Sequence, residues 1–200
     1  MRLFTGIDLP DDAINVFERL LARFRPAAHL KWSPVYNMHI TTRFIGEWPE
    51  VKLDQLRAAL ASAPQRGPIR IDLRGLGWFP NARRPRVFWA GVDGGPELRQ
   101  LAQDIDTALE PLGLPREQRE FSPHLTLARI KQPVPLDKLH EMVSELENAD
   151  FATLTADRFY LYRSQPGSAG SIYTKLSEFR FAEASVSEDV GAELHPGIHQ

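Results

Sequence analysis

Two short motifs carry the residues of this chain that are best suited to chemistry. They are His39-Ile40-Thr41-Thr42 and His124-Leu125-Thr126-Leu127. Each motif lies in a run of β-branched and apolar residues, which predicts a strand. Alternate residues of a strand point to the same face, so each motif places an imidazole beside a hydroxyl. Two such pairs facing each other would offer two proton-transfer groups and two neutral hydrogen-bond donors, a set that suits a phosphate ester.

The two motifs belong to an internal repeat. His39 and His124 are separated by 85 residues (124 − 39). The same separation relates Gly6-Ile7-Asp8 to Gly91-Val92-Asp93, and Asp72 to Asp157. Around these anchors both halves predict a strand, a helix, a motif strand, a second helix and a strand. We therefore expect a duplicated chain with pseudo-two-fold symmetry, in which the paired motifs meet across a central cleft.

The elements that must position the motifs follow from hydrophobic spacing and from Pro and Gly. We expect strands at 2–8, 30–33, 38–45, 69–76, 87–92, 124–130, 153–162 and 172–181. We expect helices from Pro10 to before Pro26 and at 49–61, 96–112 and 135–147, and loops at 78–86 and 164–171. Residues 183–200 are acidic and poor in large apolar side chains, which predicts a C-terminal tail. A single domain at 1–182 is the expected unit.

Alternation along the first motif strand predicts which side chains face the cleft. His39, Thr41 and Arg43 share one face, which is polar. Met38, Ile40 and Phe44 share the other face and are expected in the core. In the second motif strand, alternation places Arg129 opposite His124. A bulge or the end of the strand would be needed to bring Arg129 onto the face of the histidine.

A single His-x-Thr on a strand is usually a partly buried histidine bonded to a neighbour, and duplication at matching positions argues against that interpretation. Metal ligation is a second alternative, but metal sites usually take three ligands. Neither motif has a carboxylate or a second histidine within two residues.

General acid–base chemistry fits better, because one neutral histidine can accept a proton while a charged one donates. Hydrolysis of a cyclic phosphodiester needs both roles, with threonine hydroxyls stabilising the phosphoryl oxygens and no metal or cofactor required.

A basic loop follows the strand expected at 69–76. It contains Arg83, Arg84 and Arg86, with Trp78 or Phe79 at its head. The arginines are either a solvated loop or a phosphate-attracting rim beside an aromatic platform for a base. The remaining histidines lie outside the two motifs and are interpreted as structural; they are His29, His140, His195 and His199.

Composition narrows the class of protein. The chain has 200 residues, a net charge of −2 and no cysteine, which excludes disulfides, thiolate catalysis and cysteine metal sites. The charge argues against general polyanion binding. The N-terminal residues lack the apolar region of a signal peptide, and no apolar run is long enough for a membrane helix. We expect a cytoplasmic monomer without membrane contact.

These motifs resemble the two-histidine phosphoesterase superfamily, and within it the RNA 2′,3′-cyclic phosphodiesterase family, also labelled 2′-5′ RNA ligase. The resemblance covers residues 2 to about 181. It rests on the opening Arg2-Leu3-Phe4-Thr5-Gly6-Ile7, the motif regions 37–46 and 122–129, the middle segments Phe79-Pro80 and Pro85-Arg86-Val87, and the close Leu161-Tyr162-Arg163-Ser164 with Tyr173 beyond. One departure is Thr42, where leucine is usual in the family.

The resemblance implies a bilobal α+β fold with two antiparallel sheets facing across the active-site cleft. It implies opening of a 2′,3′-cyclic phosphate on an RNA end, or on a small cyclic nucleotide, to a 2′-phosphate. His39 is then the proton donor and His124 the proton acceptor, while Thr41 and Thr126 hold the phosphate. Arg129 is the implied phosphate contact, and Arg43, Phe79, Arg86 and Tyr173 are further candidates for substrate binding. Reversible 2′-5′ RNA ligation and an RNA-end-binding module without turnover remain as alternatives.

Overall fold

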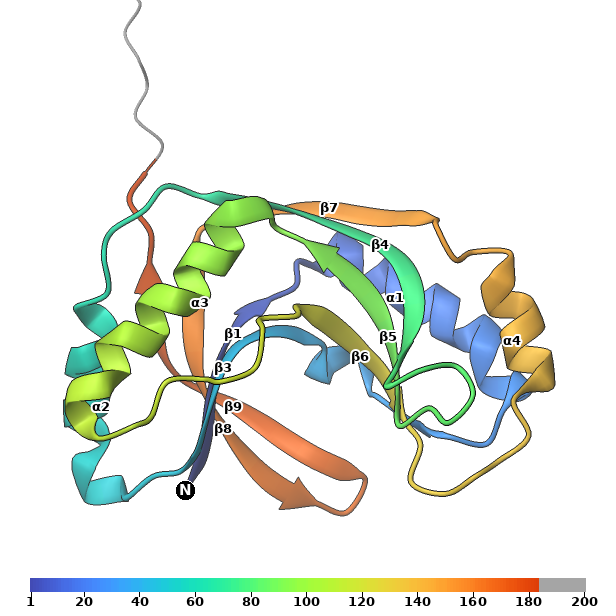
Figure 1. The fold of residues 1–200 in the computed structure, drawn as a ribbon, viewed down its shortest axis with the longest axis horizontal. Helices are drawn as coiled ribbons and strands as arrows, with labels where there is room; N and C mark the ends of the chain where they lie inside the picture. Colours follow the sequence, from blue (N-terminus) through green and yellow to red (C-terminus); the bar gives the residue numbers. More distant parts are fainter. Residues whose placement is uncertain (184–200) are drawn as a thin grey trace, which may run out of the picture.

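The computed structural model describes residues 1–183, which form two antiparallel sheets flanked by helices (Figure 1). The strands are β1 (Arg2–Asp8), β2 (Lys31–Trp32), β3 (His39–Glu47), β4 (Ile69–Phe79), β5 (Val87–Asp93), β6 (His124–Arg129), β7 (Asp150–Ala156), β8 (Arg158–Gly167) and β9 (Gly170–Arg180). The helices are α1 (Asp11–Phe24), α2 (Leu53–Ala61), α3 (Gly95–Leu109) and α4 (Asp137–Ser144). The first sheet has the order β3-β1-β8-β9 and the second β2-β6-β5-β4-β7. The predicted α+β class with two antiparallel sheets is confirmed.

Each sheet takes strands from both repeats. The first sheet contains β3, β1 and β8, and the second contains the equivalent set β6, β5 and β4. The third strand of each repeat therefore pairs in the sheet of the other repeat. The helices cross over in the same way, because α1 packs against β7 and α3 packs against β3. Figure 1 shows α2 and α3 on one side of the molecule and α1 and α4 on the other, so the two repeats are interlocked.

The helices are held by apolar stripes that face the sheets. In α1 the buried side chains recur at helical spacing and are Ala13, Phe17, Leu20, Leu21 and Phe24. Asp11 and Asp12 lie in its first turn, where carboxylates complement the positive end of the helix dipole. The stripe of α3 consists of Leu98, Leu101, Ala102, Ile105 and Leu109. Fully burying one such large apolar side chain contributes about 1.5–3 kcal/mol, so packing on the sheets dominates the stability of both helices.

The structure corrects the prediction of one strand at 153–162. This segment contains two strands, β7 in the second sheet and β8 in the first, with Asp157 between them. The chain changes sheets at this one residue. The structure also extends β4 to Phe79, so Trp78 and Phe79 lie in a strand and not in the predicted loop. The predicted loop at 164–171 is largely the paired ends of β8 and β9.

Both motif strands contain a β-bulge at the same position of the motif. In β3, Thr5 pairs with Arg43 and Gly6 with Thr41, so Thr42 is the extra residue. In β6, Phe88 pairs with Ala128 and Trp89 with Thr126, so Leu127 is the extra residue. An extra residue in one strand shifts the alternation of the residues that follow it. The bulges therefore decide which side chains after each motif join the face that carries the histidine.

The prediction for Phe44 is wrong for this reason. It pairs with Phe4, is 60% exposed and lies on the face of Thr41, not in the core. The predicted tail at 183–200 lies, beyond Glu183, outside the described residues, and so do His195 and His199. Within residues 1–183, no helix combines the length and the apolar composition required to cross a bilayer.

Candidate active site

The two His-x-Thr motifs come together at the junction of the sheets. β3 is the edge strand of the first sheet, and it approaches β6 of the second sheet closely. His39 and His124 lie near enough for the charge of His124 to lower the pKa of His39. The structure therefore brings the two motifs together, and the repeat supplies the geometry.

Both imidazoles are oriented by the same backbone contact. Nδ1 of His39 donates to the carbonyl of Asn37 at 2.7 Å, and Nδ1 of His124 donates to the carbonyl of Ser122 at 2.9 Å. A carbonyl oxygen can only accept, so Nδ1 carries the proton in each ring. Nε2 is then the nitrogen left to exchange protons with a reacting group. The two accepting carbonyls are themselves related by the repeat.

Aromatic side chains surround His39. Its ring lies 4.6 Å from that of Phe4 and 5.1 Å from that of Tyr173, which meets it edge-on at 88°. Tyr162 stacks on Phe4 at 4.9 Å and also packs against the imidazole of His39. Gly6 leaves the room for this arrangement, because a Cβ there would lie 2.9 Å from the carbonyl oxygen of Ile40. The predicted residue Tyr173 is therefore brought into contact with the first motif.

His124 has a matching aromatic neighbour. Phe79 meets its ring edge-on at 5.1 Å and 83°, and Phe79 also lies 5.2 Å from Trp89. Trp78 points the other way and stacks on buried Phe88 at 4.5 Å. Of the two aromatic residues suggested for a base platform, the structure places Phe79 at the site, while Trp78 is partly buried and packs against the core.

Burial lowers the pKa of both histidines. Desolvation is the largest cause for His39 and for His124, since it disfavours the charged imidazolium. The backbone hydrogen bonds to Nδ1 act against this effect in both rings. Asp8, which pairs with His39 across β1 and β3, also raises the pKa of His39. Of the two imidazoles, only His39 has a carboxylate among the groups that shift its pKa.

The threonines share the faces of their histidines. The hydroxyl of Thr41 lies 3.0 Å from Nε2 of His39. Thr126 pairs with Trp89 and lies two residues after His124 on the same face of β6. Like Thr41, it is half-buried. Each motif thus places one hydroxyl beside one imidazole, as alternation predicts.

Arg129 reaches this face because of the bulge at Leu127. After the bulge, Leu127 and Ala128 are both buried, and Arg129 pairs with Val87 on the face of Trp89 and Thr126. The exposed guanidinium lowers the pKa of both His39 and His124. One cation that acts on both imidazoles lies near the point where the motifs meet.

The structure places Arg43 on the opposite face, so the prediction that it faces the cleft is wrong. Arg43 pairs with fully buried Thr5, because the bulge at Thr42 places Arg43 on the face of β3 that lies away from His39. Its Nε donates to Oδ1 of Asp106 at 2.7 Å, and its terminal nitrogens donate to the carbonyls of Phe44 and Pro115. The side chain of Arg43 is only 11% exposed. Its hydrogen bonds are made within the protein.

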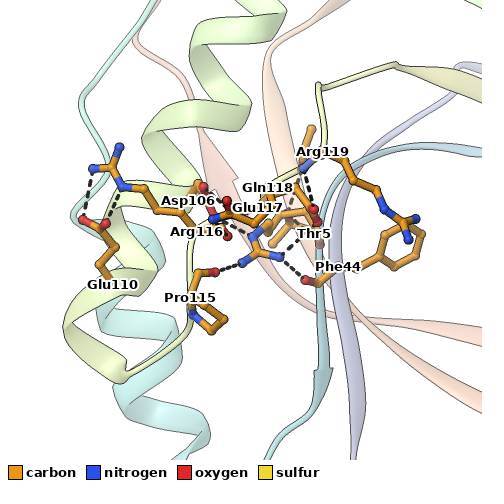
Figure 2. A network of polar contacts seen from close by, with 11 residues as sticks. Thr5, Phe44, Asp106, Glu110, Pro115, Arg116, Glu117, Gln118 and Arg119 are labelled. Atoms are coloured by element: carbon orange, nitrogen blue, oxygen red, sulfur yellow. Dashed lines mark hydrogen bonds and ion pairs between the residues drawn. The ribbon is translucent and has the colours of Figure 1, made fainter.

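The hydrogen bonds of Arg43 join β3 to the segment that leads to the second motif, and Figure 2 shows this polar network with Asp106 and Pro115 labelled. Asp106 on α3 accepts from Arg43 and from the backbone N–H of Glu117 at 3.0 Å. The same segment is held again by Arg116, which forms an ion pair with Glu110. Residues 115–119 are thereby fixed shortly before His124. Arg43 acts on the site as an anchor for this segment.

The other predicted arginines lie on the β4–β5 connection. The backbone N–H groups of Arg83 and Arg84 both donate to Oδ1 of Asn81 at 3.0 Å, which shapes the turn. The carbonyl of Arg86 accepts from the N–H of Ile130 at 2.9 Å. This bond brings the backbone of Arg86 beside the end of β6, with its side chain exposed.

Three contributors were missed by sequence reasoning. Asp8 influences His39 and forms an ion pair with Lys175. Asn37 and Ser122 orient the imidazoles through their carbonyls. The repeat could have identified Asn37 and Ser122, because they have the same sequence separation as the two histidines. It could also have identified Asp8, which belongs to the repeated segment Gly6-Ile7-Asp8.

Comparisons with known proteins show which family this chain resembles over most of its length. The family model described as the 2′-5′ RNA ligase superfamily matches residues 9–167. A protein of Methanothermobacter thermautotrophicus named RNA 2′,3′-cyclic phosphodiesterase is 33% identical over 183 residues, which cover 90% of this chain and 98% of that protein. A relative of the same name from Thermus thermophilus is 33% identical and covers 90% and 89% of the two chains.

Solved structures show the same fold. The crystal structure of the Thermus thermophilus protein TT0787 has a TM-score of 0.77 at 31% identity and covers 90% of this chain and 98% of that one. The crystal structure of E. coli LigT complexed with 3′-AMP has a TM-score of 0.71 at 26% identity, with 90% and 97% covered. The resemblance drawn from the motifs is confirmed, and the chain belongs to the 2′-5′ RNA ligase superfamily.

Proposed function

We propose that this chain is an RNA 2′,3′-cyclic phosphodiesterase that opens the cyclic end to a 2′-phosphate without a metal ion. The observation that carries the proposal is the matched pair of histidines, each with Nδ1 held by a carbonyl and Nε2 left for proton exchange. The curated relatives with this activity in their names match nearly the whole described chain. RNA ends and small cyclic nucleotides both contain the reacting group.

The reaction assigns one proton transfer to each histidine. Nε2 of His124 accepts a proton from a water molecule as the water oxygen bonds to phosphorus. The bond between phosphorus and the ribose 3′ oxygen breaks, and Nε2 of His39 donates a proton to that oxygen. The product is a 2′-phosphomonoester with a free 3′ hydroxyl. Transfer of a proton between the product-state histidines through solvent restores both for the next turnover.

Negative charge on the phosphoryl oxygens is stabilised by the neighbouring donors. Thr41 and Thr126 each present a hydroxyl beside a histidine, and Arg129 contributes a guanidinium on the same face. Fixed donors of this kind are effective because they need no reorganisation as charge develops. Together the five side chains offer an acid, a base and three donors, which covers the roles that a metal ion would otherwise fill.

The test is turnover of an oligonucleotide that ends in a 2′,3′-cyclic phosphate, after treatment with EDTA and desalting. We expect unchanged hydrolysis to a 2′-phosphate, identified by its comigration with an authentic 2′-phosphate standard, and not with the 3′ isomer, on chromatography. Recovery only on addition of one divalent ion would overturn metal independence. Joining to an RNA with a 5′ hydroxyl would instead show ligation, and retention of unchanged RNA would show binding alone.

A further inference from the structure

A basic groove lies beside the candidate active site, at the edge of the second sheet. It has a volume of about 300 Å³ and is lined by residues of two segments, one around β2 and one after β6. Its cationic residues are Lys31, Arg129 and Lys131. Arg129 belongs both to this groove and to the face that carries the histidines. The groove is therefore continuous with the site.

Strand pairing orients the cations of this groove. Lys31 pairs with Arg129 across β2 and β6, and directly paired residues of antiparallel strands share a face. Lys31 also reaches toward the β8–β9 turn, since a side chain at Gly170 would meet its Cε at 4.0 Å. Figure 1 shows this hairpin extending from the first sheet toward the second. The side chain of Lys31 thus lies next to Arg129 and near the β8–β9 turn of the first sheet.

The charges of the groove are not neutralised within the described chain. Among residues 1–183, neither lysine nor Arg129 has a carboxylate within ion-pair distance. Acidic residues are also absent from several segments of the sequence that build this region. None of the 26 acidic residues falls in the segments 19–46, 73–92, 121–136 and 158–177, which contribute β2, β6, most of β3 and the β8–β9 hairpin. The charged side chains of these four segments are therefore all Lys or Arg, although the whole chain has a net charge of −2.

We propose that this groove binds the backbone phosphates of the RNA strand that precedes the cyclic end, with Lys31 and Lys131 as the contacts. Arg129 then lies at the boundary between the reacting phosphate and the first upstream phosphate. The cations are separate lysines on an open groove, so they bind phosphate by charge and read no base sequence. The inference rests on the proposed function, because it takes the position of the cyclic end from it.

The experiment compares four substrates with increasing numbers of upstream phosphates: a cyclic mononucleotide, the same with a 5′-phosphate, a trinucleotide and a decamer. Lys31→Gln and Lys131→Gln are tested singly and together. Lys52→Gln is the matched control, since this exposed lysine lies next to α2, away from the groove. We expect each groove variant to raise KM for the decamer by on the order of threefold to fivefold at low salt. The slope of the logarithm of the decamer binding constant against the logarithm of salt concentration should become shallower by about 0.7 for each lysine removed.

The outcomes separate the possible sources of phosphate. Loss of binding that grows from the 5′-phosphorylated mononucleotide to the decamer supports a track for an RNA strand. If the 5′-phosphorylated mononucleotide already shows the full loss of binding, the proposal is wrong, because contact with a single terminal phosphate then accounts for the whole effect of the lysines. Equal effects on all four substrates, or no difference from Lys52→Gln, also overturn the proposal. Fluorescence anisotropy with a decamer ending in a 2′-phosphate measures the groove without turnover, so failure of the proposed reaction is seen separately.

Discussion

Arg129 and Phe44 occupy equivalent positions in the two repeats. They have the same sequence separation as His39 and His124, and each returns to the histidine face after a bulge. The pseudo-two-fold symmetry of the site is therefore broken at this position by a guanidinium on one side and a phenyl ring on the other. At these two equivalent positions, a phosphate bound between the histidines would meet a cation from the second motif and a phenyl ring from the first.

This asymmetry predicts opposite results for two substitutions. Arg129→Ala should weaken inhibition by inorganic phosphate about tenfold and lower kcat/KM, because it removes a charged donor. Phe44→Ala should leave phosphate inhibition unchanged, since a phenyl ring offers no charge to the anion. Inhibition constants measured at constant ionic strength test this. Equal weakening in both variants would mean that Arg129 has no special access to the phosphate.

Arg43→Ala should destabilise the fold, in contrast to Arg129→Ala. The pair Arg43–Asp106 has side chains that are 11% and 15% exposed, so removing the arginine leaves a largely buried carboxylate without its partner. We expect a loss of about 2–4 kcal/mol in the free energy of unfolding. Arg70→Ala, which breaks an exposed pair, is the control and should cost less than about 1 kcal/mol. Urea denaturation measures both.

The activity of Arg43→Ala provides a second readout. The arginine anchors residues 115–119 ahead of His124, so kcat should fall while KM for short substrates changes little. Arg43→Lys should recover only part of this, because one ammonium cannot make the divergent hydrogen bonds of a guanidinium. A large rise in KM with an unchanged kcat would instead place Arg43 in substrate binding.

Removal of either motif histidine should abolish most turnover. His39→Ala and His124→Ala should each lower kcat by about 10²- to 10⁴-fold with an unchanged circular dichroism spectrum. Thr41→Ala and Thr126→Ala should cost less, because each removes one neutral hydrogen-bond donor. Single-turnover kinetics distinguish these effects from product release. Near-normal activity in a histidine variant would remove that residue from the mechanism.

The direction of proton transfer can be tested with the leaving group. A p-nitrophenyl phosphodiester has a leaving group that departs without protonation, so it has little need of a general acid. Relative to wild type, His39→Ala should retain much more kcat/KM on this substrate than on a cyclic phosphate, and His124→Ala should not. Selective rescue of His124→Ala would reverse the two roles, and equal losses would show that both histidines chiefly position the phosphate.

The pH dependence should reflect the burial of both imidazoles. Because burial lowers both pKa values below 6.5, the protonated acid and the neutral base coexist best on the acidic side of that value. Asp8 raises the pKa of His39, so Asp8→Asn removes this effect and lowers that pKa further. The optimum of kcat/KM should therefore move to lower pH in Asp8→Asn. Asp93→Asn changes the equivalent carboxylate of the other repeat and should leave the optimum in place.

Most of the fold near the motifs could be predicted from sequence, because alternation and the repeat are local and strong signals. The bulges could not. Thr42 and Leu127 are β-branched or apolar residues that fit an uninterrupted strand, and only pairing with β1 and β5 shows that they are extra. That is why alternation alone assigns Arg43 and Phe44 to the wrong faces, and why the position of Arg129 needed the structure.

The change of sheet at Asp157 was also invisible in the sequence. Residues on both sides have strand-like composition, so 153–162 resembles one strand. Pairing of β7 with β4 and of β8 with β1 separates them, and both contacts are distant in sequence. Side-chain pattern specifies a strand but does not specify its partner. The partner depends on tertiary packing.

The exchange of the third strand between repeats has a consequence for synthesis of the protein. β1 lies between β3 and β8, and Tyr173 lies on β9, so the aromatic surroundings of His39 are incomplete until residue 173 has left the ribosome. A nascent chain that already displays both histidines still lacks Tyr162 and Tyr173 behind the first one. Contacts of such long sequence separation form late and slowly. The competence to act on RNA should therefore arise in one step once β8 and β9 have been synthesised, and prematurely terminated chains that stop before β8 should have none.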